Sequence, residues 1–564
     1  MVSQEASQPH AAYYTGSPKY VEDDSQKTRH DEEKGGSSID TSDAENGHQL
    51  KRELKGRHMQ MIAVGGAIGA GLFVGSGSAL QAGGPASLVL GFIIIGFMLL
   101  LTMQALTELA VLFPVNGAFF TYAVRFIDPS WGFATGWDYA IGWLVILPFE
   151  ITAASLTIAF WDSAKSINIG VWITVFLVAL SAVQIFGIRG YGEVEFVLSI
   201  IKILACTGFI ILGIIINCGG VPTDHRGYIG ARYWHDPGAF RHGFKGFCSV
   251  FVTASFAFGG TELTGLAAAE AKNPLKSIPQ ATKQVFWRIA FFYVICLFIL
   301  GLNVPSDSDV LLNSHGANTK ASPFVYAMVL AGIKGLPSVF NVVICLSVLS
   351  VANSSAYGST RTMQALAAHG MGPKFLAYID KSGRPLWCVL IQLSFGLLAF
   401  VNEATNGGPQ FFNWLLALTG LANFFIWATI CLSHIRFRAG WKAQGRSIEE
   451  IPYKAFFGIW GSYIGIAMNI ICLIATFYVA LWPVGGSPDA EDFFESYLAA
   501  PLILTMYLCW KIYTRDWKLF IRAAEMDVTT GMRHNLAELR EMAEERQRSL
   551  GLASWPKRVV RALF

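Results

Sequence analysis

Three ionisable side chains lie within stretches of sequence that are apolar and long enough to cross a membrane. They are Glu150, Lys202 and Glu262. A charged residue inside such a span costs at least ~2.5 kcal/mol on insertion scales, so each one is a candidate for function. A carboxyl group can carry a proton, and desolvation disfavours a charged lysine enough to let it exchange one near neutral pH. The three residues are therefore candidates for proton coupling.

These and two neighbouring carboxylates also allow other interpretations. Glu150 lies beside Pro148, which frees a carbonyl, so it could contact a substrate or, when protonated, bond to another helix. Glu262 follows a glycine pair at the expected start of a half-helix, where the helix dipole favours a carboxylate. It could hold two segments together or exchange protons. Asp138 fits either a structural or a functional role. Glu108 is expected at the cytosolic face, within reach of water, in a structural role.

The segment 59–81 reads MQMIAVGGAIGAGLFVGSGSALQ and carries six glycines between Gly65 and Gly77. About 20 apolar residues span the ~30 Å hydrocarbon core as a helix, so the segment can cross a bilayer. Each glycine costs a helix interior about 1 kcal/mol relative to alanine, so the run 69–71 predicts a break at mid-depth. Freed backbone is tolerated there only where it lines protein or a cavity, which indicates a ligand site. A close-packed helix seam is the alternative.

A second apolar segment, 246–268, is interrupted in the same way by Phe258-Gly259-Gly260-Thr261. The two segments are the first and the sixth predicted spans, with four spans between them, so they run in opposite directions across the membrane. Two glycine-broken spans at matching places in two halves indicate an inverted-repeat transporter. Unpaired N–H groups at a break attract a carboxylate, and unpaired carbonyl groups attract an ammonium. The pair of breaks therefore suits a zwitterion such as an α-amino acid.

We expect the backbone N–H groups of Gly69, Ala70 and Gly71 to bind the substrate carboxylate. Carbonyl groups around Ala67 and Ala257 would receive the amine. The full set of expected substrate-binding residues is Ala67, Ile68, Gly69, Ala70, Gly71, Phe256, Ala257, Phe258, Gly259 and Thr419.

The composition is that of an all-α polytopic membrane protein. Of the 564 residues, 53% are hydrophobic and only 14% are charged, whereas about 25% are charged in soluble proteins. We predict about twelve membrane spans, near 59–81, 86–110, 132–160, 169–187, 194–217, 246–268, 288–304, 338–358, 387–402, 411–435, 459–482 and 497–513. The segment 323–336 is predicted to be a short helix at the outer surface.

The distribution of charge sets the predicted orientation. Residues 1–50 hold ten acidic and four basic residues with few aliphatic ones, so they should be disordered. They also lack the apolar core of a cleaved signal peptide. Predicted cytosolic loops between spans hold 15 lysines and arginines and external loops hold 7, which places both termini in the cytosol. We divide the chain into a tail (1–57), a transport core (58–435), two further spans (436–514) and a C-terminal tail (515–564).

The remaining motifs exclude several classes of function. Nine cysteines show no metal-ligand spacing, so we expect no metal and no cofactor. Cys218 and Cys248 flank one external loop and could form a disulfide or remain free thiols. A P-loop, a G-x-S-x-G elbow and an H-E-x-x-H motif are all missing from the sequence, which argues against an ATP-driven pump and against an enzyme. Nucleic acid is not an expected partner.

Six motifs, in order along the chain, resemble the fungal amino-acid permease family of the amino acid–polyamine–organocation superfamily. They are GGAIGAGLFVGSG, LPFEITAAS, FAFGGTEL, NSSAYGSTRTMQALA, LTGLANFF and EMDVTTGMR. The resemblance covers nearly the whole chain from Leu54 to about Arg533. It implies two inverted five-helix repeats, with helices 1 and 6 broken, plus two extra helices. It also implies uptake of L-amino acids across the plasma membrane, coupled to protons.

The resemblance also suggests roles for individual residues. Lys202 falls between spans one, five and eight, where sodium-coupled relatives bind a cation, so its ammonium would replace the metal ion. We hypothesise that its charge state biases the tilt of the broken first span; a fixed cation paired with Glu195 or helix-end carbonyl groups is the alternative. Phe256 falls where relatives place an aromatic gate, although packing is the commoner fate of a phenylalanine. Thr419 lies in a stretch that resembles one shaping side-chain selectivity.

Function and substrate range stay open at this stage. An amino-acid exchanger and an amino-acid sensor are alternatives to a proton symporter. The expected site offers small and aromatic groups with Glu150 as its main charge, which suits neutral amino acids or a broad range. Ubiquitin-ligase machinery is a candidate partner of the tails, and lysines 19, 27, 34, 51 and 55 are available.

Overall fold

The computed structural model describes residue 54 and residues 56–164, 166–308, 322–403, 408–533 and 536–551. Within these ranges every extended element of regular structure is a helix, which confirms the all-α class. A single parallel bridge joins Leu54 to Ala271. The N-terminal tail that we predict to be disordered, with its five lysines, falls almost wholly outside the described residues.

The helices fall in chain order as follows. The first part contains α1 (Gly56–Ala67), the π-helical turn Gly71–Gly75, α2 (Ser76–Leu112), α3 (Ala118–Phe126), α4 (Pro129–Ile158), α5 (Ile169–Ile185) and α6 (Gly187–Asn217). The middle contains α7 (Gly243–Phe258), α8 (Leu263–Leu266), the turn Ala267–Glu270, α9 (Pro274–Asn303), α11 (Pro323–Leu330) and α12 (Leu336–Ala368). The last part contains α13 (Leu386–Gly396), the turn Leu397–Glu403, α14 (Gly408–Ala443), α15 (Gly458–Leu481), α16 (Ala490–Tyr497), α17 (Ala499–Thr514) and α18 (Leu536–Gly551).

Seven helices among the described residues are long and apolar enough to cross a membrane, and three shorter apolar helices accompany them. This is fewer than the twelve spans we predict. One reason is that the second half of the first span continues directly into the second span, so both count as one helix, 71–112. The join is marked by Gly84, whose φ of 80° lies outside the helical region, followed by Pro85. The total of twelve stays a prediction.

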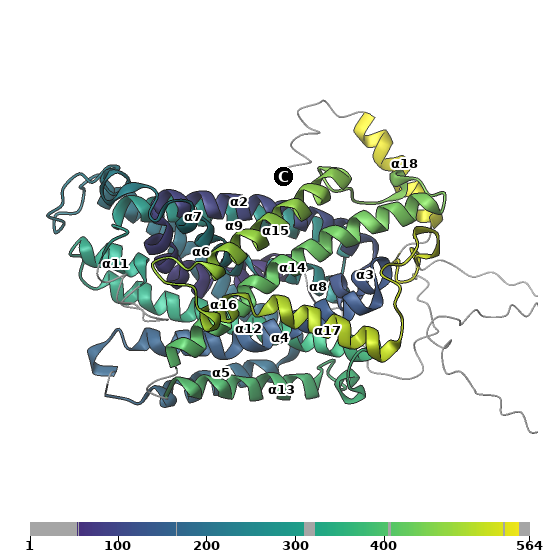
Figure 1. The fold of residues 1–564 in the computed structure, drawn as a ribbon, viewed down its shortest axis with the longest axis horizontal. Helices are drawn as coiled ribbons and strands as arrows, with labels where there is room; N and C mark the ends of the chain where they lie inside the picture. Colours follow the sequence, from purple (N-terminus) through teal and green to yellow (C-terminus); the bar gives the residue numbers. More distant parts are fainter. Residues whose placement is uncertain are drawn as a thin grey trace, which may run out of the picture. The chain divides into compact units, whose positions relative to one another are not determined.

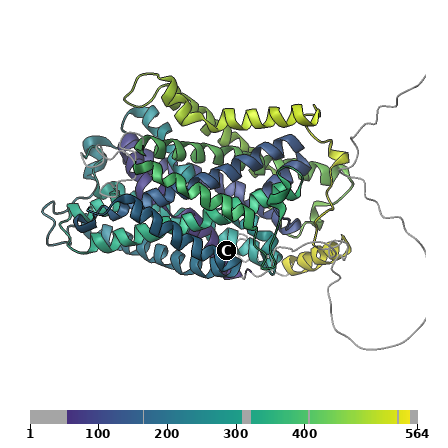
Figure 2. The same cartoon turned by 90° about the horizontal axis from the view of Figure 1, so that it is seen from below.

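The long helices run side by side (Figure 1). α4 packs along α12, and α2 packs along both α7 and α9. α5 and α13 lie together beyond α4. In the view turned by 90°, the yellow-green segment that holds α16 and α17 lies along one edge (Figure 2).

Large apolar side chains cover the outer faces of several helices. Val178 on α5, Leu204 on α6 and Ile474 on α15 are each more than 60% exposed. Soluble proteins rarely expose contiguous apolar surface of this kind, because water disfavours it. A lipid environment accounts for it, in agreement with a multi-pass membrane protein.

Glu108 has the structural role that we expect, but not the contact with water. Its side chain is fully buried. Arg438 on α14 forms a two-pronged ion pair with it, at 2.8 Å from Nε to Oε1 and 2.7 Å from Nη2 to Oε2. The backbone N–H of Ala455 donates a third hydrogen bond, at 2.7 Å. Glu108 therefore fastens α2 to α14 and to the segment before α15.

Both cysteines that flank the external loop are free thiols in the structure. Cys218 is exposed and Cys248 is buried on α7. The sequence left a disulfide and two free thiols as alternatives, and the structure has two free thiols.

Candidate functional site

Two helices are interrupted at the positions that the glycines predict. α1 ends at Ala67, and the chain bends at Ile68 and Gly69 before helical structure resumes at Ala70. α7 ends at Phe258, and residues 259–262 form turns before α8 begins. Each interruption frees backbone N–H and C=O groups from the helical ladder.

The two interruptions are packed against each other. A Cβ atom added to Gly71 would lie 2.6 Å from Cα of Ala257, and one added to Gly260 would lie 2.6 Å from the carbonyl oxygen of Gly66. Gly260 also has a φ of 94°, which L side chains rarely adopt. The glycines therefore do both things that the sequence allows: they break the helices and they let the backbones approach.

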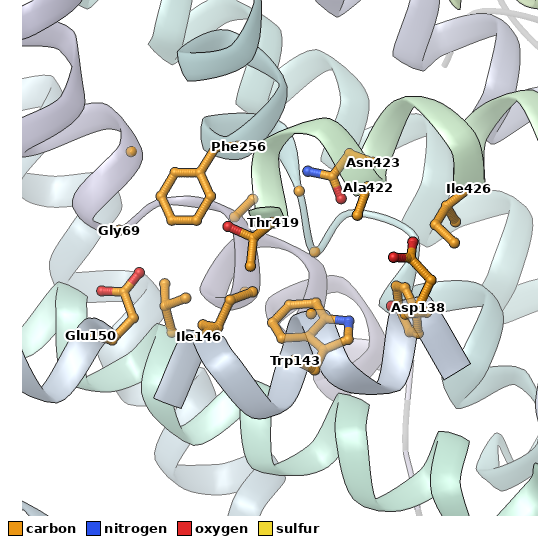
Figure 3. Close-up of a pocket in the computed structure, with 18 residues that line it drawn as sticks. Gly69, Asp138, Trp143, Ile146, Glu150, Phe256, Thr419, Ala422, Asn423 and Ile426 are labelled. Atoms are coloured by element: carbon orange, nitrogen blue, oxygen red, sulfur yellow. The ribbon is translucent and has the colours of Figure 1, made fainter. Parts of the chain in front are cut away.

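A pocket lies beside the interruptions (Figure 3). On one side α4 lines it with Asp138, Gly142, Ile146 and Glu150, which are spaced four residues apart and so share one face of the helix. On the other side α14 lines it with Thr419, Ala422, Asn423 and Ile426. The remaining lining residues are Gly66, Ala67, Gly69, Gly71, Tyr139, Trp143, Phe256, Gly259, Gly260 and Val351.

The pocket brings together some of the residues that we predict and leaves others outside. Those that line it are Ala67, Gly69, Gly71, Glu150, Phe256, Gly259 and Thr419. Those that are buried nearby without lining it are Ile68, Ala70, Lys202, Ala257, Phe258 and Glu262. The first group forms part of the pocket wall, and the second group is buried outside the lining.

Phe256 and Phe258 point in different directions, because residues two positions apart on a helix do not face each other. Phe256 lines the pocket and packs edge-on against Phe149, with ring centroids 5.2 Å apart. Phe258 packs instead against Tyr293 at 4.7 Å and Phe92 at 5.7 Å. Of the two, only Phe256 lines the pocket, and its role as a gate stays a prediction.

Glu150 and Lys202 are two ionisable side chains that lie behind the first interruption. Both side chains are fully buried, and each acts electrostatically on the other. Neither carboxyl oxygen of Glu150 has a side-chain hydrogen-bond partner within the described part of the chain, and the backbone N–H of Ala70 is directed towards this group. A Cβ atom on Gly69 would lie 3.5 Å from Oε1 of Glu150, so this carboxyl group faces the break directly.

Lys202 also has Glu195 as an electrostatic neighbour, one of the alternatives raised by the sequence. Glu195, on α6, accepts hydrogen bonds from two residues of α12. Ser350 donates a short one, and Nδ2 of Asn353 donates one at 3.1 Å. Ser199 Oγ, on the same helix as Lys202, donates to the carbonyl oxygen of Met61 on α1 at 2.9 Å. A polar network thus connects α1, α6 and α12 around the lysine.

Glu262 holds the second interruption in place. Its two oxygens accept hydrogen bonds from the N–H of Gly260 at 3.1 and 3.2 Å, and Oε1 accepts one from the hydroxyl of Tyr139 at 3.2 Å. Because Tyr139 belongs to α4, these bonds connect the break to the helix that lines the pocket. This favours the structural role among those the sequence allows.

Tyr293 on α9 is a residue that the sequence analysis did not single out. Its hydroxyl group lies 2.7 Å from the carbonyl oxygen of Ala67 and 2.6 Å from that of Ala257. A hydroxyl group has one proton, so it donates to one of these oxygens at a time. These are the carbonyl groups that we expect to receive the substrate amine, and each has a further lone pair. No pattern in the sequence points to this tyrosine.

A buried ion pair lies at the end of the second interrupted helix. Arg361 Nε donates to Glu270 Oε1 at 2.6 Å, and the hydroxyl of Tyr357 donates to Glu270 Oε2 at 3.0 Å. Tyr357 in turn stacks on Tyr191, with centroids 4.9 Å apart and planes 8° apart. These contacts join the end of the second broken helix to α12 and α6.

Comparison with known proteins identifies the family of the chain. Residues 58–523 match the family model described as amino acid permease. The chain belongs to the amino acid permease family. It is therefore a transporter rather than an enzyme, and amino acids are its substrates. Within the described residues no group of three His, Cys, Asp or Glu side chains is placed to hold a metal ion.

Two similar proteins come from yeasts. The general amino-acid permease GAP1 of Saccharomyces cerevisiae is 53% identical over 504 residues, which cover 88% of this chain and 83% of that protein. Cationic amino acid transporter 1 of Schizosaccharomyces pombe is 53% identical over 494 residues, which cover 87% and 83% of the two chains. Among solved structures, a mutant of the Eremococcus coleocola manganese transporter aligns with a TM-score of 0.50 at 14% identity, over 81% of this chain and 94% of that one. That similarity concerns the fold alone.

Proposed function

We propose that this permease imports amino acids across the plasma membrane by proton symport, with neutral amino acids or a broad range as its substrates. The observation that carries the proposal is that both helix interruptions and Glu150 meet at one pocket. The inward proton gradient and the membrane potential supply the driving force, the latter ~2.3 kcal/mol per charge for each 100 mV.

The substrate backbone is bound at the interruptions. The N–H groups of Gly69, Ala70 and Gly71 receive the carboxylate, because the helix that follows them has its positive end there. The free lone pair of the Ala67 carbonyl group receives the amine, with the oxygen held in position by Tyr293. Phe256 covers the substrate, and Thr419 contacts its side chain from α14.

Lys202 and Glu150 carry the proton. Both are fully buried, so a change in the charge of either one is costly and must be balanced locally. Neutral Lys202 would leave Glu150 and Glu195 without their neighbouring cation, which changes the forces on α1. Glu262 moves protons only if its hydrogen bonds to Gly260 and Tyr139 open.

The fold that we propose has twelve spans, arranged as two inverted repeats of five with two additional helices, and both termini in the cytosol. In support, the two interrupted helices lie five spans apart along the chain and meet in the structure. Alternating access then results from rocking of one group of helices around the pocket.

Uptake into vesicles tests the coupling mechanism. The purified protein is reconstituted into vesicles that contain no amino acid, and labelled leucine is added outside with or without an inward proton gradient. Symport predicts accumulation only with the gradient, together with proton entry that a pH-sensitive dye detects inside. Uptake that requires a preloaded amino acid and ignores the gradient would instead identify an exchanger.

A further inference from the structure

We propose that the pocket has a separate subsite for a cationic side chain, built on Asp138, so that lysine and arginine are among the substrates. This inference rests on the proposed function, because it assumes that the pocket binds an amino acid. It goes further by assigning a substrate class and a specificity-determining residue.

The side chain of Asp138 is the first line of evidence. It is 2% exposed, and its Oδ2 has no hydrogen-bond partner within the described residues. It nevertheless lines the pocket, at the opposite end of the α4 row from Glu150 (Figure 3). A buried carboxylate without a partner is costly, and a cation that enters the pocket would offset that cost.

The distance from the helix interruptions suits a long side chain. A Cβ atom on Gly260 would lie 3.3 Å from the ring of Trp143, so the second interruption lies at the level of that residue. Asp138 is five residues earlier on α4, which corresponds to about 7.5 Å along the helix axis. A substrate whose backbone is held at the interruptions can therefore extend an aliphatic stem past Trp143 and bring its charged end to Asp138.

Gly142 leaves the path to Asp138 open. It lines the pocket one helical turn from Asp138, and a Cβ atom at this position would meet nothing within 4 Å. The neighbouring Ile146 and Ile426 offer apolar surface to the stem, and the indole of Trp143 offers a face for a cation. A side chain at position 142 would close this space.

The charge of the lining also favours a cation. The lining residues include the carboxylates of Asp138 and Glu150 and no Lys, Arg or His. Glu150 has Lys202 as a neighbour, whereas Asp138 forms no ion pair among the described residues. The carboxyl group without a cationic neighbour therefore lies at the end of the pocket away from the first interruption, where a cation that enters would favour its ionised form.

The test compares lysine, arginine and leucine uptake in a transport-deficient yeast, for the wild type and for Asp138→Asn, with surface protein measured in each strain. We expect the ratio of lysine to leucine uptake efficiency to fall at least tenfold, and the arginine ratio likewise. The exposed carboxylate variant Glu525→Gln is the matched control and should leave both ratios at the wild-type value. Gly142→Leu should reduce lysine and arginine uptake more than alanine uptake, because it fills the open path.

The outcomes separate this inference from the proposed function. Wild-type uptake of leucine without lysine or arginine would overturn the subsite and leave the proposed function standing. If Asp138→Asn lowered the uptake of lysine, arginine and leucine equally and changed the pH profile, Asp138 would be a proton carrier. This result would also overturn the subsite. If the wild type imports no amino acid, both proposals fail.

Discussion

The hydroxyl group of Tyr293 lies 2.7 Å from the carbonyl oxygen of Ala67, the last residue of α1. The same hydroxyl is 2.6 Å from the carbonyl oxygen of Ala257, just before the second interruption. One side chain from α9 thus spans the ends of both broken helices. It satisfies backbone groups that a continuous helix would have satisfied, at the place where the substrate amine is expected.

Replacing Tyr293 by Phe should lower amino-acid uptake tenfold or more at unchanged surface level. The change removes the hydroxyl and leaves two buried carbonyl groups with fewer donors, and each unsatisfied buried group costs about 1–3 kcal/mol. Because the carbonyl groups also face the substrate amine, we expect KM to change together with the maximal rate. Uptake of Tyr293→Phe at the wild-type rate and KM would show that the hydroxyl has no part in binding.

Replacing Gly71 by Leu should abolish uptake while the protein still reaches the cell surface. A Cβ atom there would lie 2.6 Å from Cα of Ala257, so the two interruptions could no longer pack together. Gly208→Leu on α6 is the matched control, because a Cβ atom at that exposed position meets nothing within 4 Å. Surface labelling and leucine uptake are measured for both variants. Normal uptake by the Gly71 variant would contradict the proposed carboxylate site.

The sequence contains enough information to locate the interruptions but only part of the pocket wall. Gly69 and Gly260 are visible because glycine inside an apolar span is costly, and the structure has breaks at both positions. Asp138 and Gly142 share the face of α4 that includes Glu150, at intervals of four residues. The same four-residue spacing leads from Glu150 back to Asp138. The row does not stand out in the sequence, because Gly142 by itself looks like a packing residue.

Other parts of the site cannot be found by pattern. Tyr293 is one tyrosine in an apolar helix, and its partners are backbone carbonyl groups 226 and 36 residues away. Glu108 is similar, because its partner Arg438 is 330 residues away. A partner so distant in the sequence leaves no local pattern that would indicate a buried carboxylate. The sequence alone therefore predicts that Glu108 lies at the membrane surface, within reach of water.

Replacing Lys202 by Met should reduce uptake strongly and make the remaining uptake insensitive to external pH. The substitution keeps much of the buried volume. It removes the amine, a neighbour of Glu150 and Glu195, that we propose takes up and releases the proton. Lys442→Met, at an exposed position on α14, serves as the control and should keep the wild-type pH profile. Uptake is measured across a range of external pH with surface protein quantified. A wild-type rate and pH profile for the Lys202 variant would rule out proton coupling at this residue.

Replacing Arg361 by Met should destabilise the protein by about 3–5 kcal/mol, because it leaves a buried carboxylate without its partner. Arg361 and Glu270 are 7% and 2% exposed at their side chains, and their bond joins α12 to the end of the second broken helix. The double variant with Glu270→Leu should recover part of the loss. Thermal unfolding of the purified protein in detergent gives both values. If the two substitutions were simply additive, the charges would not interact.

The C-terminal segment before α18 is bound to α3 and α14 through its backbone carbonyl groups. Arg125 on α3 donates to the carbonyl oxygen of Thr530 at 2.5 Å, and Gln444 on α14 donates to that of Met526 at 2.6 Å. Between these residues, Oδ1 of Asp527 accepts hydrogen bonds from the N–H groups of Thr529 at 3.0 Å and Thr530 at 2.9 Å. Asp527 therefore fixes the turn that presents Thr530 to Arg125.

Replacing Asp527 by Ala should release this segment, because alanine has no side-chain oxygen to accept the hydrogen bonds from Thr529 and Thr530. Partial burial acts to raise the pKa of Asp527, but the hydrogen bonds from Thr530 and Thr529 and the charge of Arg125 outweigh it, so the pKa lies below its ordinary value. A carboxyl group with a lowered pKa stabilises the folded state above the pKa of the unfolded chain, and this contribution is lost as the pH falls through the lowered value. At neutral pH the wild-type segment should thus resist limited proteolysis, whereas Asp527→Ala should be cleaved several times faster after Lys518. Glu525→Ala, at an exposed position outside the turn, should be cleaved at the wild-type rate. Equal cleavage of the wild type and both variants would show that the turn does not hold the tail.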